Sequence, residues 1–294
     1  MNSSIAAEPV EGSESGLPDL QALERSLLDW FHGCSGAVVA FSGGVDSAVV
    51  AYAAHQALSQ QALAATADSA SLPRHELIEA TDLAKRIGIE HRLIATQEVI
   101  DPAYLKNDSQ RCFHCKSHLF QALRQLVEVR DKGWWMLSGT NRDDLGEWRP
   151  GLRAADEYGV RSPLAELGID KSAVRALAQR WQLPVAEKPA TPCLASRVAY
   201  GVSVTPERLA MIEGAEAELR KLGLASFRVR LHEGELARIE VPAGDLMRLT
   251  DAAVRERLIR RFAQLGFRFV TLDLEGFSSG SLNRLISIAP RAST

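Results

Sequence analysis

The segment Phe41-Ser42-Gly43-Gly44-Val45-Asp46-Ser47 lies between two apolar runs. Residues 37–41 are small and β-branched, which suits a buried strand, and residues 48–54 begin a stretch long enough for a helix. Gly43 and Gly44 therefore occur where a strand turns into a helix. Because they lack Cβ atoms, their backbone can approach a ligand closely and direct N–H groups at it. The positive end of the helix dipole lies at the same place, so the segment is a candidate anion-binding loop.

A plainer interpretation of this segment is a Gly-Gly turn with Asp46 or Ser47 as the helix N-cap. The segment lacks the Gly-Lys-Ser/Thr ending of the Walker loop, so it provides no lysine for a terminal phosphate. It resembles instead the pyrophosphatase loop of ATP-dependent adenylating enzymes, which cleave ATP between the α and β phosphates and leave AMP on an acceptor oxygen. That resemblance implies that ATP is bound by Ser42, Gly43, Gly44, Val45, Asp46 and Ser47.

The composition narrows the class of protein. A chain of 294 residues with 46% apolar residues is long enough for two domains with real cores. Its net charge of −3 and pI near 6.2 argue against a nucleic-acid-binding protein, which is usually strongly basic. No apolar run approaches the roughly 18 to 20 residues of a membrane span. Residues 1–18 are polar and acidic, so they predict a disordered tail rather than a secretory signal.

The rest of the chain divides near Gly201. Strands predicted at 62–67, 89–95 and 134–138 alternate with helices at 74–87 and 111–129, which predicts an α/β fold with a doubly wound parallel sheet over residues 19–201. Ligands of such sheets bind at the carboxyl ends of the strands, where Asp68 and Ser69 lie. Residues 202–294 predict a smaller α+β domain, with a capped helix at 205–222 and paired strands at 227–231 and 236–241. We expect this domain to bind substrate and to support a homo-oligomer.

Three of the four cysteines are candidates for chemistry. Cys112 and Cys115 form a CxxC at the start of a predicted helix, and Cys193 stands alone in a proline-rich loop. Without a disulfide framework or an export signal, we expect a reducing cytoplasm, where cysteines indicate metal binding or catalysis. A CxxC alone fits a redox dithiol, part of a zinc site with His114 or His118, or ligands of an iron–sulfur cluster. Three thiolates without an obvious fourth ligand suit a [4Fe–4S] cluster with one open iron.

Two further groups follow predicted strands. Asp143 and Asp144 come after the strand at 134–138, where carboxylates suit Mg²⁺ beside phosphates, although an N-cap is the plainer interpretation. Arg228 and Arg230 alternate on one strand and so share a face, where they can pair with a phosphate or carboxylate. A solvated edge strand is the plainer interpretation of that pair.

Taken together, these motifs resemble the LarE family, the ATP-dependent sulfur transferases of nickel-pincer nucleotide biosynthesis. The resemblance covers nearly the whole chain after the tail. Its motifs are the phosphate loop with Asp68-Ser69, Arg111-Cys112-Phe113-His114-Cys115-Lys116, Gly139-Thr140-Asn141-Arg142-Asp143-Asp144-Leu145 continuing to Arg149-Pro150-Gly151, Pro192-Cys193-Leu194-Ala195-Ser196-Arg197, and Arg228-Val229-Arg230 with Ala237-Arg238-Ile239-Glu240.

The family resemblance implies a substrate, a reaction and partners. Pyridinium-3,5-biscarboxylate mononucleotide is adenylated on a carboxylate and then thiolated, and two rounds give the bisthiocarboxylate that later holds nickel. The fold implied is the ATP pyrophosphatase (adenine nucleotide alpha hydrolase-like) type. The implied cofactors are ATP, Mg²⁺ and a [4Fe–4S] cluster, and the implied partners are a sulfur donor and other proteins of nickel-pincer biosynthesis.

Residue roles follow from the resemblance by position. In part of the family a single cysteine, matching Cys193, gives up its own sulfur and becomes dehydroalanine, whereas the three-cysteine branch holds a [4Fe–4S] cluster. The presence of Cys112 and Cys115 favours the cluster branch. The remaining implied roles are catalysis for Asp46 and Cys193, nucleotide binding for Asp68, Gly139 and Thr140, Mg²⁺ binding for Asp143 or Asp144, and binding of the substrate phosphate for Arg228, Arg230 and Glu216.

Two alternatives remain open from sequence. The first is a tRNA-thiolating enzyme of the same superfamily, which would require a basic surface for RNA. The second is a non-catalytic protein that binds a nucleotide or carries a metal, and it would bind ATP without releasing pyrophosphate.

Overall fold

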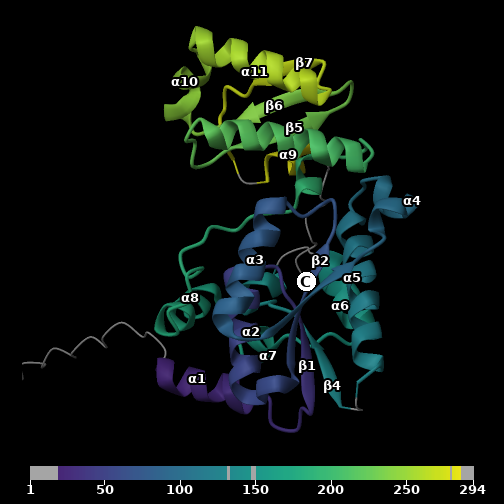
Figure 1. Ribbon diagram of the computed structural model, residues 1–294, viewed down its shortest axis with the longest axis vertical. Coiled ribbons are helices and arrows are strands. Elements are labelled where there is room, and N and C mark those ends of the chain that lie inside the picture. Colours follow the sequence, from purple (N-terminus) through teal and green to yellow (C-terminus); the bar gives the residue numbers. More distant parts are fainter. Residues whose placement is uncertain (1–18, 131–132, 147–149, 279, 286–294) are drawn as a thin grey trace, which may run out of the picture.

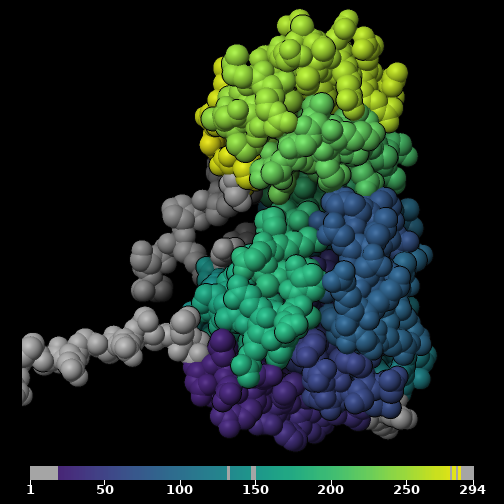
Figure 2. All heavy atoms as spheres, turned by 60° about the vertical axis from the view of Figure 1, so that its left-hand side comes forward, coloured from purple at the N-terminus to yellow at the C-terminus, as the bar shows by residue number. Residues whose placement is uncertain are grey.

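The computed structural model describes residues 19–130, 133–146, 150–278 and 280–285. The predicted tail at 1–18 and Arg149 of the family motif lie outside the described residues. The chain forms an N-terminal region, purple to teal, with a smaller C-terminal region, green to yellow, stacked on one end of it (Figures 1 and 2).

The N-terminal region is built on a four-stranded parallel sheet in the order β3-β2-β1-β4. This confirms the predicted α/β fold with a parallel sheet. The strands are β1 (Gly36–Ala40), β2 (Ala62–Asp68), β3 (Glu90–Ala95) and β4 (Trp134–Leu137). The helices are α1 (Leu20–Asp29), α2 (Val45–Leu58), α3 (Arg74–Ile87), α4 (Pro102–Leu105), α5 (Arg111–Glu128), α6 (Pro150–Tyr158), α7 (Pro163–Glu166) and α8 (Lys171–Arg180).

Strand β1 shows why the sheet has helices on both faces. Alternate side chains of a strand point to opposite faces, so Ala37 and Val39 pack into one apolar cluster with α2 and α8. Val38 points the other way and packs with Phe120 and Leu123 of α5. Because both faces are buried, the strand is apolar throughout rather than alternating. Because the four strands are parallel, their carboxyl ends meet at the same edge of the sheet, where the β1–α2 loop lies.

The C-terminal region is a small α+β unit, as predicted. Strand β5 (Arg228–His232) pairs antiparallel with β6 (Leu236–Glu240), which pairs parallel with β7 (Phe269–Leu272). Helices α9 (Pro206–Lys221) and α11 (Ala252–Leu265) supply Leu209, Ile212 and Phe262 to its core, and α10 (Leu246–Thr250) adds Leu249. Thr205 caps α9 by accepting from the Arg208 amide, so the predicted cap is confirmed.

The junction between the regions differs from the simplest expectation. Leu194, Ala195 and Val198 pack in the core of the C-terminal region, and Val198 forms a β-bridge with Leu231. The segment around Cys193 therefore packs with the C-terminal region, although it precedes the predicted division at 201, which stays a prediction. The sequence analysis did not predict helices α4 and α6. Among the described residues, no helix is both long and apolar enough to cross a membrane.

Candidate active site

The loop between β1 and α2 has the geometry of an anion site. Helix α2 begins after Gly44, which caps it without any side-chain hydrogen bond, so Asp46 and Ser47 do not act as N-caps and the plainer interpretation is wrong. Ser47 Oγ donates to the Gly44 carbonyl at 3.0 Å and lies 3.2 Å from Ser42 Oγ, which fixes the loop from within. Gly43 has φ +73°, and a Cβ there would lie 2.9 Å from Ala80 Cβ, so only glycine fits.

Asp46 is held beside this loop by two residues distant in sequence. Asn141 Nδ2 donates to Asp46 Oδ1 at 3.0 Å, and Lys171 Nζ donates to Asp46 Oδ2. Lys171 is the first residue of α8, which Asp170 caps. Sequence reasoning missed this lysine because the phosphate loop itself carries none and Lys171 lies 125 positions after Asp46 in the chain. It brings a positive charge to the edge of the phosphate site.

A cavity of about 290 Å³ extends from the loop toward the end of β4. Its lining brings together most of the predicted nucleotide residues, namely Ser42, Asp46, Ser47, Gly139 and Thr140, with Asp144 and Lys116. The segment after β4 lies close to the start of α2, because a Cβ on Gly139 would lie 2.7 Å from the Ser47 nitrogen.

The two residues predicted to bind Mg²⁺, Asp143 and Asp144, lie in different surroundings. Asp144 lines the cavity beside Asp46, and its Oδ2 accepts from the Asn141 amide at 3.1 Å. Asp143 lies outside that lining, and its Oδ2 accepts from the Lys171 amide at 3.0 Å. Of these carboxylates, those of Asp46 and Asp144 line the cavity.

Asp68 does not line either cavity next to the phosphate loop. It ends β2 and forms a half-exposed ion pair with Arg74, six residues later in the chain. The next residue, Ser69, does line one of these two cavities. Its hydroxyl donates to Glu98 Oε1, and its oxygen accepts from the Ser71 amide at 3.0 Å.

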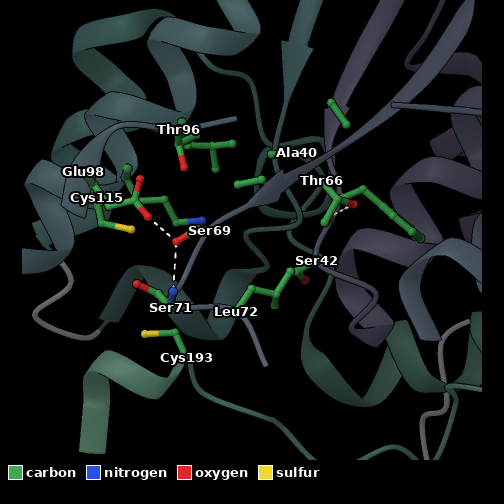
Figure 3. A pocket seen from close by; sticks show the side chains of 15 residues that line it. Ala40, Ser42, Thr66, Ser69, Ser71, Leu72, Thr96, Glu98, Cys115 and Cys193 are labelled. Atoms are coloured by element: carbon green, nitrogen blue, oxygen red, sulfur yellow. Dashed lines mark hydrogen bonds between the residues drawn. The ribbon is translucent and has the colours of Figure 1, made fainter. Parts of the chain in front are cut away.

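A second cavity, of about 170 Å³, connects the phosphate loop to two thiols (Figure 3). Ser42 lies on one side of it, and Cys115 of α5 and Cys193 lie on the other. Burial and the neighbouring Cys193 raise the pKa of the Cys115 thiol to about 12. We call this space the thiol cavity. It places sulfur next to the site where ATP phosphates would lie.

Cys112 is not part of the thiol cavity. It lies three residues before Cys115 on α5, where it is exposed, and its Sγ is 3.9 Å from Arg111 Nη2. Within the part of the chain that the structure describes, no three His, Cys, Asp or Glu side chains are grouped closely enough to hold a metal ion. The donor types suit an iron–sulfur cluster, but the three thiols are not preassembled for one. The fourth cysteine, Cys34, is a buried core residue.

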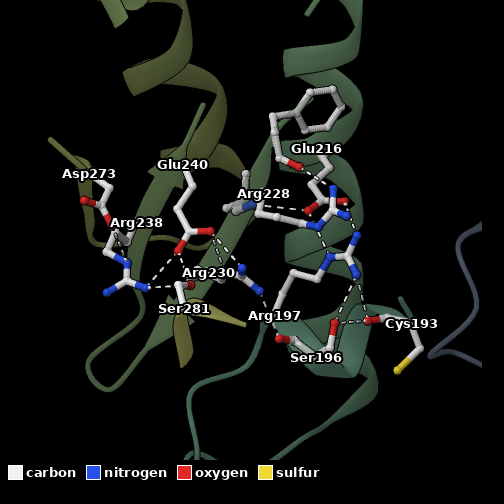
Figure 4. A network of polar contacts seen from close by, with 12 residues as sticks. Cys193, Ser196, Arg197, Glu216, Arg228, Arg230, Arg238, Glu240, Asp273 and Ser281 are labelled. Carbon is white, nitrogen blue, oxygen red and sulfur yellow. Dashed lines mark hydrogen bonds and ion pairs between the residues drawn. The ribbon is translucent and has the colours of Figure 1, made fainter. Parts of the chain in front are cut away.

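The C-terminal region contributes a network of arginines and glutamates (Figure 4). Arg230 is buried and donates to Glu240 Oε2 from Nε at 3.0 Å and from Nη2 at 2.8 Å. Arg238 donates to the other oxygen of Glu240 at 2.9 Å. Arg230 Nη1 also donates to the Ser196 carbonyl at 3.2 Å. The solvated-strand interpretation is therefore wrong for Arg230, whose charge is neutralised inside the protein.

Glu216 is engaged in the same network. Its Oε1 accepts from Arg197 Nε at 3.1 Å and from the Val229 amide at 3.2 Å, and only 4% of the residue is exposed. Arg197 in turn donates from Nη1 to the carbonyl of Cys193 at 3.0 Å. Glu216 thus joins the Cys193 segment to β5, a function that its position in the sequence did not indicate.

Arg228 differs from its neighbours, because its charge meets no carboxylate within 4.0 Å among the described residues. Its guanidinium lies over the ring of Phe277, 5.2 Å from the centroid. Burial and the nearby Arg197 lower the pKa of Arg228. It lines a cavity of about 150 Å³ together with Arg230, Arg111, Tyr200 and Phe277. This cavity combines cations with aromatic rings, as an anionic ligand with a ring would require.

Comparison with known proteins finds relatives that match most of this chain. Residues 23–122 match a family model described as NAD synthase. The chain is 43% identical over 268 residues to an uncharacterised protein of Synechocystis sp., covering 91% of this chain and 99% of that protein. It is 35% identical over 256 residues to the pyridinium-3,5-bisthiocarboxylic acid mononucleotide synthase of Lactiplantibacillus plantarum, covering 86% and 91%. It is 26% identical over 281 residues to a tRNA-specific 2-thiouridylase of Acidiphilium cryptum, covering 76% of each.

Proposed function

Because the chain belongs to the LarE family, we propose that it is the ATP-dependent sulfur transferase that converts pyridinium-3,5-biscarboxylic acid mononucleotide to its bisthiocarboxylic form. The observation that carries this proposal is the thiol cavity, which Ser42 of the phosphate loop lines together with Cys115 and Cys193. An enzyme that activates a carboxylate with ATP and then replaces its oxygen with sulfur needs those two functions side by side.

The chemistry explains the order of the two steps. A carboxylate is a poor electrophile, because its oxygen is a poor leaving group. Transfer of AMP to that oxygen releases pyrophosphate and gives a mixed anhydride from which AMP leaves readily. A sulfur nucleophile then forms a C–S bond as the C–O bond to AMP breaks.

This chain's residues have separate roles in the first step. The N–H groups of the loop and the start of α2 bind the phosphates, and Lys171 adds positive charge beside Asp46. Asp46 and Asp144, which line the same cavity, would hold Mg²⁺, and the ion would neutralise phosphate charge there. Arg228 binds the phosphate of the mononucleotide, with Tyr200 and Phe277 lining the space for its ring. Arg230 lines the same cavity, and its ion pair with Glu240 holds it in place.

We also propose that Cys112, Cys115 and Cys193 bind a [4Fe–4S] cluster that supplies the sulfur. Metal ligation keeps thiols deprotonated, which the Cys115 environment alone does not favour. Binding requires Cys112, which is exposed, to move toward Cys115 and Cys193. The sulfur donor, the partner proteins of the same biosynthesis and a homo-oligomeric state stay predictions.

The function is tested by anaerobic incubation of the protein with ATP, Mg²⁺ and the pyridinium mononucleotide. We expect release of pyrophosphate and AMP and a product mass that shows exchange of oxygen for sulfur. Unfractionated tRNA in place of the mononucleotide tests the alternative represented by the 2-thiouridylase relative. Thiolation of tRNA but not of the mononucleotide would contradict the proposal.

The cluster is tested by replacing one cysteine at a time with alanine. We expect C112A, C115A and C193A to lose bound iron and sulfur transfer while retaining pyrophosphate release, and C34A to retain all three. If C112A still gives one turnover and leaves dehydroalanine at position 193, Cys193 is a sacrificial donor and the cluster is wrong.

A further inference from the structure

Two buried polar atoms just beyond β3 lack hydrogen-bond partners among the described residues. They are Thr96 Oγ1 and Glu98 Oε2, and both residues line the thiol cavity. Glu98 is only 1% exposed. Buried polar atoms are normally paired, because leaving one without a partner carries the full cost of removing it from water. These two atoms therefore indicate a ligand that supplies their partners.

The position of Glu98 is fixed by its other oxygen. Glu98 Oε1 accepts from the Ser69 hydroxyl, and the Ser69 oxygen accepts from the Ser71 amide at 3.0 Å. Ser71 Oγ is in turn 2.5 Å from the hydroxyl of the buried Tyr104. This chain of contacts holds Glu98 through Oε1 and leaves Oε2 as the carboxylate oxygen without a partner among the described residues.

The cavity between these atoms and the phosphate loop suits a planar ring. Ser42 lies on one side of it, and Thr96 and Glu98 lie on the opposite side (Figure 3). Apolar residues make up much of the remaining lining, among them Ala40, Ala65, Ala67 and Leu72. A nucleotide whose phosphates are bound at the loop would place its base in this space and the far edge of the base against Thr96 and Glu98.

We propose that Glu98, assisted by Thr96, selects adenine among the purines by accepting a hydrogen bond from its 6-amino group. A carboxylate oxygen accepts hydrogen bonds, and the adenine amino group donates them. Guanine carries a carbonyl oxygen at the same position, so two acceptors would face each other. The Thr96 hydroxyl can donate to the adjacent ring nitrogen of adenine. The inference rests on the proposed binding of ATP at the phosphate loop.

The test is calorimetric binding of ATP and of GTP to the full chain without an acceptor substrate. We expect the wild type to prefer ATP and Glu98→Gln to lower that preference by about tenfold or more, because an amide can donate to the guanine carbonyl. Glu98→Ala should weaken ATP binding by about tenfold or more, as expected when a hydrogen bond to a charged group is lost. Thr96→Val should weaken it less. The matched control is Glu90→Gln, which changes an exposed carboxylate on β3.

Each outcome has a defined meaning. Unchanged ATP-to-GTP preference in Glu98→Gln would overturn the inference, as would an equal loss for both nucleotides, which indicates a structural role. A defect confined to sulfur transfer would show that Glu98 serves the thiols instead, and would also overturn it. Binding selectivity is measured without the pyridinium substrate, so failure of the proposed function leaves this result readable.

Discussion

The phosphate loop and the arginine network present hydrogen-bond donors and positive charge in different ways. The loop is one short segment whose donors are backbone N–H groups left open by a glycine cap. The network draws Arg197, Arg228 and Arg230 from two segments, and two of these three are already paired with buried glutamates. An anion site made by the backbone is therefore complete in the local sequence. One made by side chains depends on which cations the fold has already neutralised.

The largest effect should come from breaking a buried pair of the network. Arg230→Ala leaves Glu240 buried with one cation fewer, and breaking such a pair costs about 3–5 kcal/mol of unfolding free energy. Urea denaturation measures this loss. Arg228→Ala, with no carboxylate partner within 4.0 Å in the described chain, is the control. Equal stability losses for the two variants would remove the distinction between them.

Substitution of Gly44 in the phosphate loop should reduce activity more than it reduces stability. Gly44→Val should lower pyrophosphate release by roughly 100-fold, the effect of losing donors aimed at developing charge, because a β-branched side chain blocks the approach of the phosphates. The fold should persist, since the nearest atom to a Cβ at Gly44 is Ser42 Oγ at 3.4 Å. Gly43→Val, by contrast, should unfold readily because of its φ of +73° and its contact with Ala80. Wild-type pyrophosphate release by Gly44→Val would show that the loop is not the phosphate site.

Arg228 should affect one ligand only. Arg228→Ala should weaken binding of the pyridinium mononucleotide by about 10- to 100-fold, corresponding to about 1.5–3 kcal/mol for a hydrogen bond to a charged group, and leave ATP binding unchanged. Calorimetric titration with each ligand measures both effects. A matching loss of ATP affinity would mean that the two sites are not separate.

The smallest effect concerns the thiols between the two regions. In metal-free protein near pH 8, Cys115 should be alkylated more slowly than Cys112, because the thiolate is the reactive form and burial raises the Cys115 pKa to about 12. The Cys115 rate should continue to rise with pH up to about 12. Mass spectrometry of alkylated peptides measures both rates. Equal rates at pH 8 would contradict the raised pKa of the Cys115 thiol.

Sequence reasoning succeeded where a structure depends on neighbouring residues. Helix α3 was predicted with its exact limits, because Gly88 ends it in a left-handed conformation. The parallel sheet followed from apolar runs that are buried on both faces. The phosphate loop needed only its glycines and the two elements beside them.

It did not foresee contacts between residues that are distant in sequence. Lys171 reaches Asp46 across 125 positions, and no local pattern signals that contact. The contacts of the Glu216 carboxylate with Arg197 and the Val229 amide were not foreseen, and its assignment to substrate binding stays a prediction. Asp68 ends β2, and its ion pair with Arg74 was not foreseen, so its assignment to nucleotide binding stays a prediction. Helix α6 was not predicted, because the residues before it are polar and give no signal for the start of a helix.

The contact of Arg197 with the Cys193 carbonyl has a consequence for exchanging parts between relatives. Arg197 is fully buried and joins the backbone at Cys193 to Glu216 of α9, so the sulfur-bearing residue and α9 are best inherited from one parent. A chimera joined at residue 201 would combine Arg197 and Glu216 from different parents across a tightly packed contact. A chimera joined before Pro192 would keep them together, and only the surface against the ATP-binding region would then be new.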